Sequence, residues 1–191
     1  MYNGFMVTVG VDEVGRGCWA GPLVAGAVVL LEPIAGLKDS KKLSKKQREN
    51  LAAEIELQAV AVGLGWVDVT TIDEVGISTA VKMAMEQALK QLEVDYDELI
   101  IDGNVNFFPD NPKAKAVIKA DDSVPAVSAA SIVAKVARDK YMEGLAGDYV
   151  NYQFAKHVGY GTALHLELLK KFGVSDMHRK SYKPVRALLV Q

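Results

Sequence analysis

Cysteine is scarce in this sequence, because Cys18 is the only one among 191 residues. A single thiol has no partner for an internal disulfide, so a hydrophobic core has to hold the fold together. Hydrophobic residues make up 50% of the chain, which is enough for one well-packed core at this length. We therefore expect one globular domain over residues 1–191.

Long apolar runs and targeting segments are also missing. Charged residues or helix breakers interrupt each apolar stretch before it reaches the length that spans a bilayer. The start of the chain, MYNGFMVTV, lacks the positive region and the small-residue cleavage site of a secretory signal. We therefore expect a cytoplasmic protein with no membrane attachment.

Charge of one sign does not dominate, since the formal net charge is −2 and the sequence pI is about 5.9. This balance argues against a protein that coats nucleic acid by bulk attraction. The charges are clustered, however: residues 37–48 and 178–186 are basic, whereas residues 93–103 are acidic. Basic clusters could hold phosphates and the acidic stretch could hold cations, but ordinary solvated helices explain such clusters equally well.

Strand-like and helix-like segments alternate along the chain. Residues 5–12 and 22–32 are rich in β-branched residues and flank a Gly- and Pro-containing segment, which predicts two antiparallel strands with a tight connection. Further strands are expected at 59–67, 98–102 and 114–120, and helices at 44–59, 78–93, 125–145 and 162–173. The alternation predicts an α/β fold with a central mixed β-sheet flanked by helices.

Acidic residues stand at the ends of three expected core strands. Asp12 ends the first, Asp102 ends a second, and Asp121 and Asp122 follow a third. Carboxylates that meet at a sheet edge repel one another unless they are protonated or neutralised by a cation. Mg²⁺ and Mn²⁺ favour carboxylate oxygen, and no pair of His or Cys residues suggests zinc. A lone acid here is more often a turn or cap residue, but three together favour a divalent metal site.

Glycines follow the first strand at positions 15, 17 and 21. Their pattern, G-x-G-x-x-x-G before a second strand-like run, matches neither the dinucleotide-binding fingerprint nor a P-loop. Taken alone, these glycines predict a structural turn. The adjacent acids Asp12 and Glu13 are what connect this turn with chemistry.

Six blocks of the sequence, in this order, resemble ribonuclease HII, the type 2 ribonuclease H. They are GVDEVGRGCWAGPLVAGAVVL, DSKKLSKKQRE, IIDGN, KADDSVPAVSAASIVAKVARDKYM, FAKHVGYGTALHLELLKKFG and HRKSYKPV. The resemblance runs from about Val9 to Pro184 and implies a ribonuclease H-like fold with a helical C-terminal part from about residue 145. Ribonuclease HIII carries an additional N-terminal substrate-binding domain, and the early first strand here favours the single-domain HII form.

The resemblance implies an endonuclease that cleaves RNA in RNA–DNA hybrids and nicks DNA on the 5′ side of an embedded ribonucleotide. The products would carry 5′-phosphate and 3′-hydroxyl ends, and the cofactor would be two divalent ions, Mg²⁺ or Mn²⁺. The acids that it assigns to catalysis and to the metal are Asp12, Glu13, Asp102 and Asp121. Asp122 is the alternative for the fourth acid, and Ala120 stands where the family often has Gly. Two metals about 4 Å apart can activate a water and stabilise the leaving oxygen, so no side-chain nucleophile is needed.

Substrate contacts are implied for two groups of residues. By resemblance, Gly15, Arg16 and Gly17 read the 2′-hydroxyl, since glycines allow close backbone approach, and Tyr160 packs on the sugar at the RNA–DNA junction. Phosphate contacts are expected from basic and hydroxyl side chains. The candidates are Ser40, Lys41, Lys42, Ser131, Lys135 and Arg138. The last two could equally lie on the solvated face of their helix.

Two rival functions remain from the sequence. A non-catalytic nucleic-acid- or metal-binding domain of this fold would show no metal-dependent cleavage. A different nuclease or transposase of the same fold class would not depend on a 2′-hydroxyl. We expect a monomer, because the sequence has no extended apolar heptad pattern.

Overall fold

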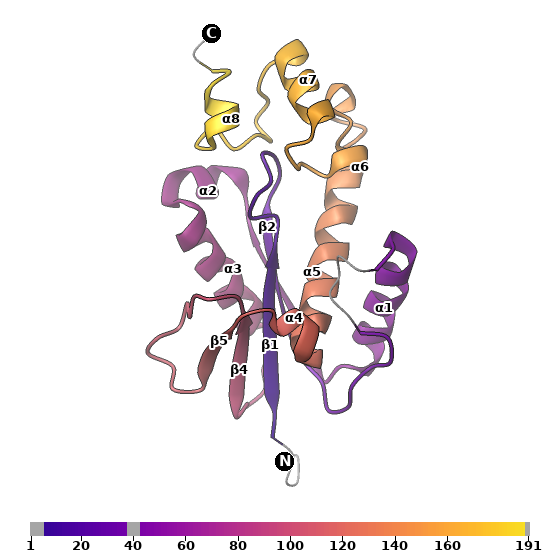
Figure 1. Ribbon diagram of the computed structural model, residues 1–191, viewed down its shortest axis with the longest axis vertical. Helices are drawn as coiled ribbons and strands as arrows, with labels where there is room; N and C mark the ends of the chain where they lie inside the picture. Colours follow the sequence, from indigo (N-terminus) through magenta and orange to yellow (C-terminus); the bar gives the residue numbers. More distant parts are fainter. Residues whose placement is uncertain (1–5, 38–42, 190–191) are drawn as a thin grey trace.

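A mixed five-stranded sheet forms the centre of the protein in this computed structural model, which describes residues 6–37 and 43–189. The strands are β1 (Thr8–Val14), β2 (Leu23–Val29), β3 (Ala61–Val67), β4 (Glu98–Asp102) and β5 (Ala114–Val117), in the order β3-β2-β1-β4-β5 (Figure 1). β2 is antiparallel to both β1 and β3, whereas β4 is parallel to β1 and to β5. The expected mixed sheet, with its antiparallel pair around the glycine turn, is confirmed.

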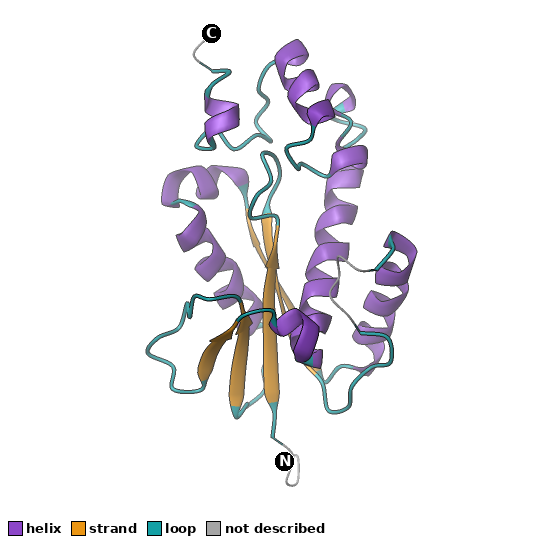
Figure 2. Ribbon diagram, viewed as in Figure 1, coloured by secondary structure: helices purple, strands orange, loops and turns teal. Residues whose placement is uncertain are grey.

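Helices cover both faces of this sheet (Figure 2). One face packs against α5 (Pro125–Gly144), with α1 (Lys45–Gln58) beside it, and the other packs against α3 (Ile77–Lys90), which follows α2 (Val69–Val75). The C-terminal part holds the 3₁₀ helix η2 (Val150–Tyr152), α6 (Phe154–His157), α7 (Ala163–Phe172) and α8 (Lys183–Arg186). In Figure 1 these last elements gather beyond the end of the β1–β2 hairpin, at the top of the view.

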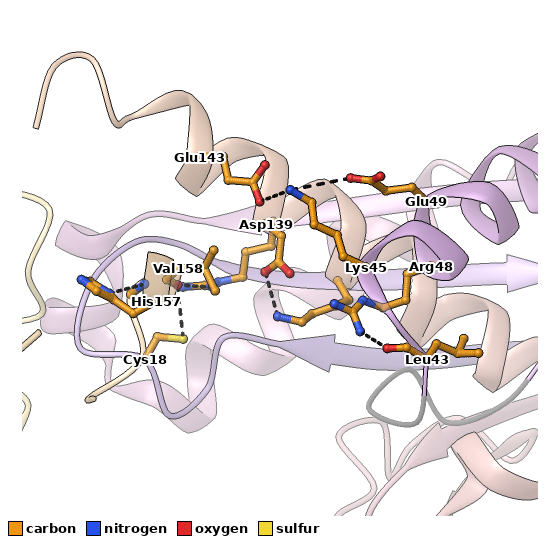
Figure 3. A network of polar contacts seen from close by, with 12 residues as sticks. Cys18, Leu43, Lys45, Arg48, Glu49, Asp139, Glu143, His157 and Val158 are labelled. Atoms are coloured by element: carbon orange, nitrogen blue, oxygen red, sulfur yellow. Dashed lines mark hydrogen bonds and ion pairs between the residues drawn. The ribbon is translucent and has the colours of Figure 1, made fainter. Parts of the chain in front are cut away.

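The helix predicted from the capping box begins as expected. The Ser44 hydroxyl accepts the Gln47 amide at 3.3 Å, and the Gln47 side chain accepts the Ser44 amide at 2.8 Å, so two free amides of the first turn are satisfied. Lys45 then reaches Glu143 of α5 at 2.6 Å and lies 3.9 Å from Glu49 (Figure 3). This ion pair joins α1 to the long helix.

Small residues let the helices lie close to the sheet. A Cβ on Gly63 or Gly65 of β3 would collide with backbone carbonyls of α3, and one on Gly10 or Gly26 would collide with the backbone of α5. Side chains on these strands alternate between the two faces, so each pair of glycines receives one helix. The result is a thin sandwich in which β1, at the middle of the sheet, is buried on both sides.

The third acid-bearing segment differs from its prediction. A strand was expected over 114–120, but β5 ends at Val117, and Lys119 adopts a left-handed conformation (φ +59°) before the short helix α4 (Ala120–Ser123). The Asp102 carboxylate accepts the Ala120 amide at 2.8 Å, which caps the new helical turn. Asp121 therefore stands in a helical turn beside β4 and not at the end of a strand.

The structure also bears on membrane attachment. Across the described residues, no helix combines the length and the apolar character needed to cross a bilayer.

Candidate active site

Three carboxylates meet beside the end of β4, next to β1. Asp12 of β1, Asp102 of β4 and Asp121 of α4 each place a carboxylate oxygen within 4.8 Å of the others. β1 does not end at Asp12, as was expected, but runs to Val14, with Asp12 paired with Gly26 of β2. The two strands run parallel with Val11 opposite Ile101, so the next residues, Asp12 and Asp102, lie side by side. The expected clustering of the acids is thus present, and α5 and α4 enclose it from one face.

Fixed hydrogen bonds hold these acids in place. Asp12 accepts the Glu13 amide at 2.7 Å, and the Ser131 hydroxyl of α5 donates to the same carboxylate. Asp102 is tied to the first turn of α4, as described above, and Ser128 donates its hydroxyl to the Asp121 carbonyl. The positions of the acids are therefore set by the backbone and by α5 before any ligand arrives.

The electrostatics of the cluster favour a bound cation. Burial raises the pKa of Asp12 to about 7, with further increases from the nearby charges of Glu13 and Asp102, while the Ser131 and Glu13 amide bonds lower it. Burial also raises the pKa of Glu13, although Arg16 opposes this. An all-carboxylate donor set in such a place fits a hard divalent ion, which would neutralise charge that the protein leaves unbalanced.

Glu13 lies beside the trio and not within it. Its carboxylate pairs with the Arg16 guanidinium at 3.3 Å, and both side chains line the same hollow as Asp12 and Asp102. Asp122 is exposed and does not belong to the three-acid cluster, whereas Asp121 is 5% exposed and does. The geometry therefore favours Asp121 over Asp122 as the buried acid of the site.

A hollow of about 240 Å³ brings many of the predicted site residues together, although Asp121 and Arg138 do not line it. It is lined by Asp12, Glu13, Val14, Gly15, Arg16, Gly17, Asp102, Ser131, Lys135 and Tyr160. The glycine turn after β1 and the GYGT segment before α7 are far apart in sequence, yet Cys18 and Tyr160, which are separated by 142 residues, pair as an isolated antiparallel bridge. The Trp19 and Ala20 amides also donate to the Gly159 carbonyl at 2.8 and 3.3 Å. The two loops thus form one wall of the hollow.

The glycines on either side of Tyr160 allow it to lie in this wall, because a larger residue at either position would clash. Gly159 has φ +86°, and a Cβ there would collide with the Ala20 carbonyl. A Cβ on Gly161 would collide with the Trp19 ring. Only glycine on both sides lets the loop approach the turn closely enough to present the Tyr160 ring, which is 36% exposed, to the hollow.

Arg138 does not have the surroundings expected for a phosphate ligand. It is fully buried, and its guanidinium donates to the carbonyls of Pro22 (2.9 Å), Ala20 (3.0 Å) and Val158 (2.8 Å). These carbonyls belong to the glycine turn and to the Tyr160 loop. The structure therefore makes Arg138 a brace between the two loops, because its donors are already occupied away from solvent. Figure 3 shows Cys18 beside Val158 at this junction, with the thiol sulfur 4.0 Å from the carbonyl oxygen.

Sequence reasoning missed a second brace, Arg179. Its guanidinium is fully buried and donates to the Gly21 carbonyl at 2.8 and 3.0 Å, and to the Arg16 carbonyl at 3.3 Å. The Tyr182 hydroxyl donates to the same Arg16 carbonyl at 2.5 Å. The basic block 178–186 contained this residue, but nothing in a single sequence separates a buried brace from a solvated cation.

The remaining expected phosphate contacts have different outcomes. Lys135 lines the hollow, with its ammonium 2.8 Å from Asp139 and 5.2 Å from the centre of the Tyr160 ring. Ser131 lines it too, with its hydroxyl directed at Asp12. Ser40, Lys41 and Lys42 lie outside the described residues.

Comparison with known proteins identifies the family. The ribonuclease HII pattern matches residues 9–185, which is nearly the whole chain. The chain belongs to the ribonuclease HII family. Ribonuclease HII of Halorhodospira halophila is 49% identical over 185 residues, an alignment that covers 95% of this chain and 94% of the relative. The resemblance noted in the sequence blocks is thereby confirmed.

Solved structures give the same result. Ribonuclease H2 from Pyrococcus horikoshii superimposes with a TM-score of 0.79 at 28% identity, covering 96% of this chain and 97% of that one. The PCNA:RNase HII complex from Archaeoglobus fulgidus matches with a TM-score of 0.80 at 28% identity, with coverage of 93% and 96%. The expected ribonuclease H-like α/β fold is therefore confirmed.

Ribonuclease HII is an endonuclease that cleaves RNA in RNA–DNA hybrids, and this is the activity of the chain. Enzymes of this family depend on a divalent metal, for which the carboxylates of Asp12, Asp102 and Asp121 are suitable ligands here.

Proposed function

We propose that this ribonuclease HII hydrolyses the phosphodiester on the 5′ side of a ribonucleotide, both in RNA–DNA hybrids and at single ribonucleotides in duplex DNA. The products carry 5′-phosphate and 3′-hydroxyl ends, and two ions of Mg²⁺ or Mn²⁺ serve the reaction. One observation carries the proposal: Asp12 and Asp102, two members of the three-carboxylate cluster, line the same hollow as a glycine turn and an exposed tyrosine.

The four acids have different roles in metal binding. Asp12 and Asp102 are the central ligands, and Glu13 and Asp121 complete the set. A bound divalent ion would lower the pKa of a water and neutralise the charge that builds on the phosphate. Ser131 and the Glu13 amide fix the orientation of the Asp12 carboxylate, and the start of α4 fixes that of Asp102. Because these supports exist without ligand, little reorganisation is needed on binding.

The glycine turn reads the sugar. A Cβ on Gly17 would meet no protein atom within 4 Å, so packing does not require glycine there, and the open space suits a closely approaching ribose. The Arg16 carbonyl is held from behind by Arg179 and Tyr182, which keeps the peptide groups of the turn in one orientation. A fixed row of peptide donors and acceptors can distinguish a 2′-hydroxyl from a hydrogen.

Tyr160 completes sugar recognition. Burial raises the pKa of its hydroxyl to about 12, so the phenol is neutral and keeps its donor at working pH. The Lys135 ammonium and the Arg138 guanidinium lie 5.2 and 5.7 Å from the ring centre, so two cations attract the ring. Lys135 also brings positive charge to the hollow, where it contacts a phosphate of the substrate.

Other parts of the proposal rest on sequence. Ser40, Lys41 and Lys42 supply further phosphate contacts, and residues 1–191 form one catalytic domain with a helical extension from about residue 145. We also propose that the enzyme works as a monomer in the cytoplasm, where DNA containing ribonucleotides is found.

The test is cleavage of a labelled duplex with one ribonucleotide in otherwise all-DNA strands, with Mg²⁺, with Mn²⁺ and with chelator, beside an all-DNA control. Metal-dependent nicking 5′ to the ribonucleotide, with the control intact, is expected. Asp102→Asn should lower kcat by at least about 100-fold without unfolding the protein, because a metal ligand is lost. Cleavage of the all-DNA control would refute the proposed recognition of the ribose. Near-wild-type activity of Asp102→Asn would refute the assignment of Asp102 as a metal ligand.

A further inference from the structure

The histidines of this chain form one buried cluster outside the acidic site. They are His157 in α6, His165 in α7 and His178 ahead of α8, and their side chains are 5%, 0% and 0% exposed. The His157 and His165 rings stack with centroids 4.2 Å apart, and the Nε2 atoms of His165 and His178 lie 3.0 Å apart. None of them lines the hollow, but the cluster lies directly behind the loop that carries Tyr160.

The hydrogen-bond partners assign a proton position to each of two rings. His178 Nδ1 accepts the Ser175 amide at 3.1 Å, so its proton lies on Nε2 and is donated to His165 Nε2. His165 therefore carries its own proton on Nδ1, which donates to the Tyr160 carbonyl at 2.9 Å. The bonds run in one direction, from Ser175 through both rings to the backbone of Tyr160.

His157 holds the same loop from its other side. Its Nε2 donates to the Tyr152 carbonyl at 2.8 Å, and its Nδ1 accepts the Gly159 amide at 3.2 Å. The Tyr160 amide in turn donates to the His157 carbonyl at 2.8 Å. The Tyr160 amide is thus bonded to the His157 backbone, while the Tyr160 carbonyl accepts from the His165 ring and also from the Thr162 amide at 2.8 Å.

The loop requires such support because its backbone conformation is unfavourable. Val158 has φ +43°, a left-handed conformation that β-branched residues rarely adopt, and Gln153 has φ +51°. These two residues flank α6, so strain lies directly before the tyrosine. Bonds to fixed rings offset this strain and select one loop position.

We propose that His165 and His178 are positioning residues for Tyr160. Their hydrogen bonds fix the Tyr160 carbonyl, and this fixes the position of the Tyr160 ring in the hollow. The position of the ring in turn determines how well the enzyme recognises the sugar. The proposal rests on the sugar-reading role proposed above for Tyr160. Both rings have to be neutral for the chain of bonds to exist, and burial lowers the pKa of His165 to about 4 and that of His178 to about 3.

Three variants test the chain. His165→Phe keeps a ring of similar size but removes both hydrogen bonds. His165→Asn retains a donor near the Nδ1 position and loses only the contact with His178. Phe154→Leu is the matched control, because Phe154 is fully buried against all three rings yet makes none of these bonds. Thermal unfolding shows which variants are folded.

For a duplex with one ribonucleotide, His165→Phe should lower kcat/KM about tenfold, the effect of losing one or two buried hydrogen bonds. His165→Asn should lose less, and Phe154→Leu should keep nearly wild-type kcat/KM despite a lower melting temperature. An equal loss in Phe154→Leu would reduce the histidines to a structural role and overturn the proposal. If His165→Phe does not fold, His165→Asn replaces it in the cycle described next.

A double-mutant cycle with Tyr160→Ala decides whether the histidine acts through the tyrosine. His165→Phe should have little further effect once Tyr160 is alanine, and the same loss in both backgrounds would overturn the proposal. Full activity of Tyr160→Ala alone would instead refute the sugar-reading role of Tyr160. The two failures therefore give different results.

Discussion

At the scale of single residues, the adjacent acids Asp121 and Asp122 differ sharply in how deeply their side chains are buried. Asp121 is buried in the three-carboxylate cluster, whereas Asp122 is exposed and does not belong to that cluster. Both acids lie in the first turn of α4, whose Ala120 amide donates to Asp102.

Replacing each acid by its amide tests this difference. Asp121→Asn should lower kcat by about 100-fold or more, because it removes a charged ligand from the metal site. Asp122→Asn is the matched control and should stay within about threefold of wild type, as expected of an exposed substitution. Steady-state cleavage of the single-ribonucleotide duplex measures both, and the reverse order of effects would make Asp122 the fourth acid.

A second prediction at this scale concerns Arg138. A single lysine ammonium cannot bond all three carbonyls that the Arg138 guanidinium bonds, so the replacement leaves buried carbonyls without a charged donor. Arg138→Lys should lower the free energy of unfolding by about 3 kcal/mol and raise KM for the substrate, because both loops lose their brace. Urea unfolding and steady-state kinetics are the measurements.

Lys140→Ala, an exposed change on the same helix, is the control for Arg138→Lys and should cost less than about 0.5 kcal/mol. Unchanged stability of Arg138→Lys would show that the bonds to the two loops contribute little.

At the scale of elements, close helix–sheet packing places the site. α5 approaches β1 and β2 so closely that glycine stands at the contact, and this approach brings Ser131 to Asp12. α3 does the same on the opposite face, over Gly63 and Gly65. Asp12 and Glu13 therefore lie on a strand of a sheet that helices hold on both faces.

Adding one methyl group at such a contact should be costly. Gly65→Ala places a Cβ against the Ala84 carbonyl and should destabilise the protein by about 2–3 kcal/mol, because backbone atoms have to move. Gly144→Ala is the matched control, since it has open space at the end of α5 and should gain up to about 1 kcal/mol. Chemical unfolding of both proteins checks this, and equal stabilities would contradict the close packing of α3.

At the scale of the whole molecule, the buried histidines make stability depend on pH. Below about pH 6.5 the histidines of the unfolded chain take up protons, whereas burial holds the pKa of His165 near 4 and that of His178 near 3 in the folded protein. The folded state then binds fewer protons, so the free energy of unfolding falls as pH drops from about 6.5 towards 4. Each proton excluded in this way gives a slope of at most about 1.4 kcal/mol per pH unit.

Melting temperatures between pH 5 and 8 test this for the wild type and for His178→Phe. The wild type should lose stability more steeply on acidification, and parallel curves would contradict the prediction. Asp176 and the other two histidines are the titratable neighbours whose charges affect the pKa of His178. Asp12 and Glu13 act in the opposite direction, because their raised pKa values let the folded state keep protons that the unfolded chain has lost. Both proteins contain these acids, so the difference between the two curves gives the contribution of His178 to the pH dependence of stability.

Much of this protein follows from local sequence. The capping box at Ser44, the antiparallel pair around the glycine turn and the strand ending at Asp102 depend on residues that are neighbours in the chain, and all three are present as expected. The family blocks, which are also local patterns, led to the ribonuclease HII assignment.

Contacts between distant segments decided the rest. The turn at Lys119 forms because the carboxylate of Asp102 caps α4, and Arg138 is a brace because the carbonyls of Ala20 and Val158 converge on it. Whether a cation is solvated or buried depends on which backbone groups the fold brings to it, and charge and spacing in the sequence do not carry that information. The sequence thus determined most of the strands, the long helices and the acids, while the tertiary structure alone decided where the strand before Asp121 ends, how the two substrate loops are joined and what holds them in place.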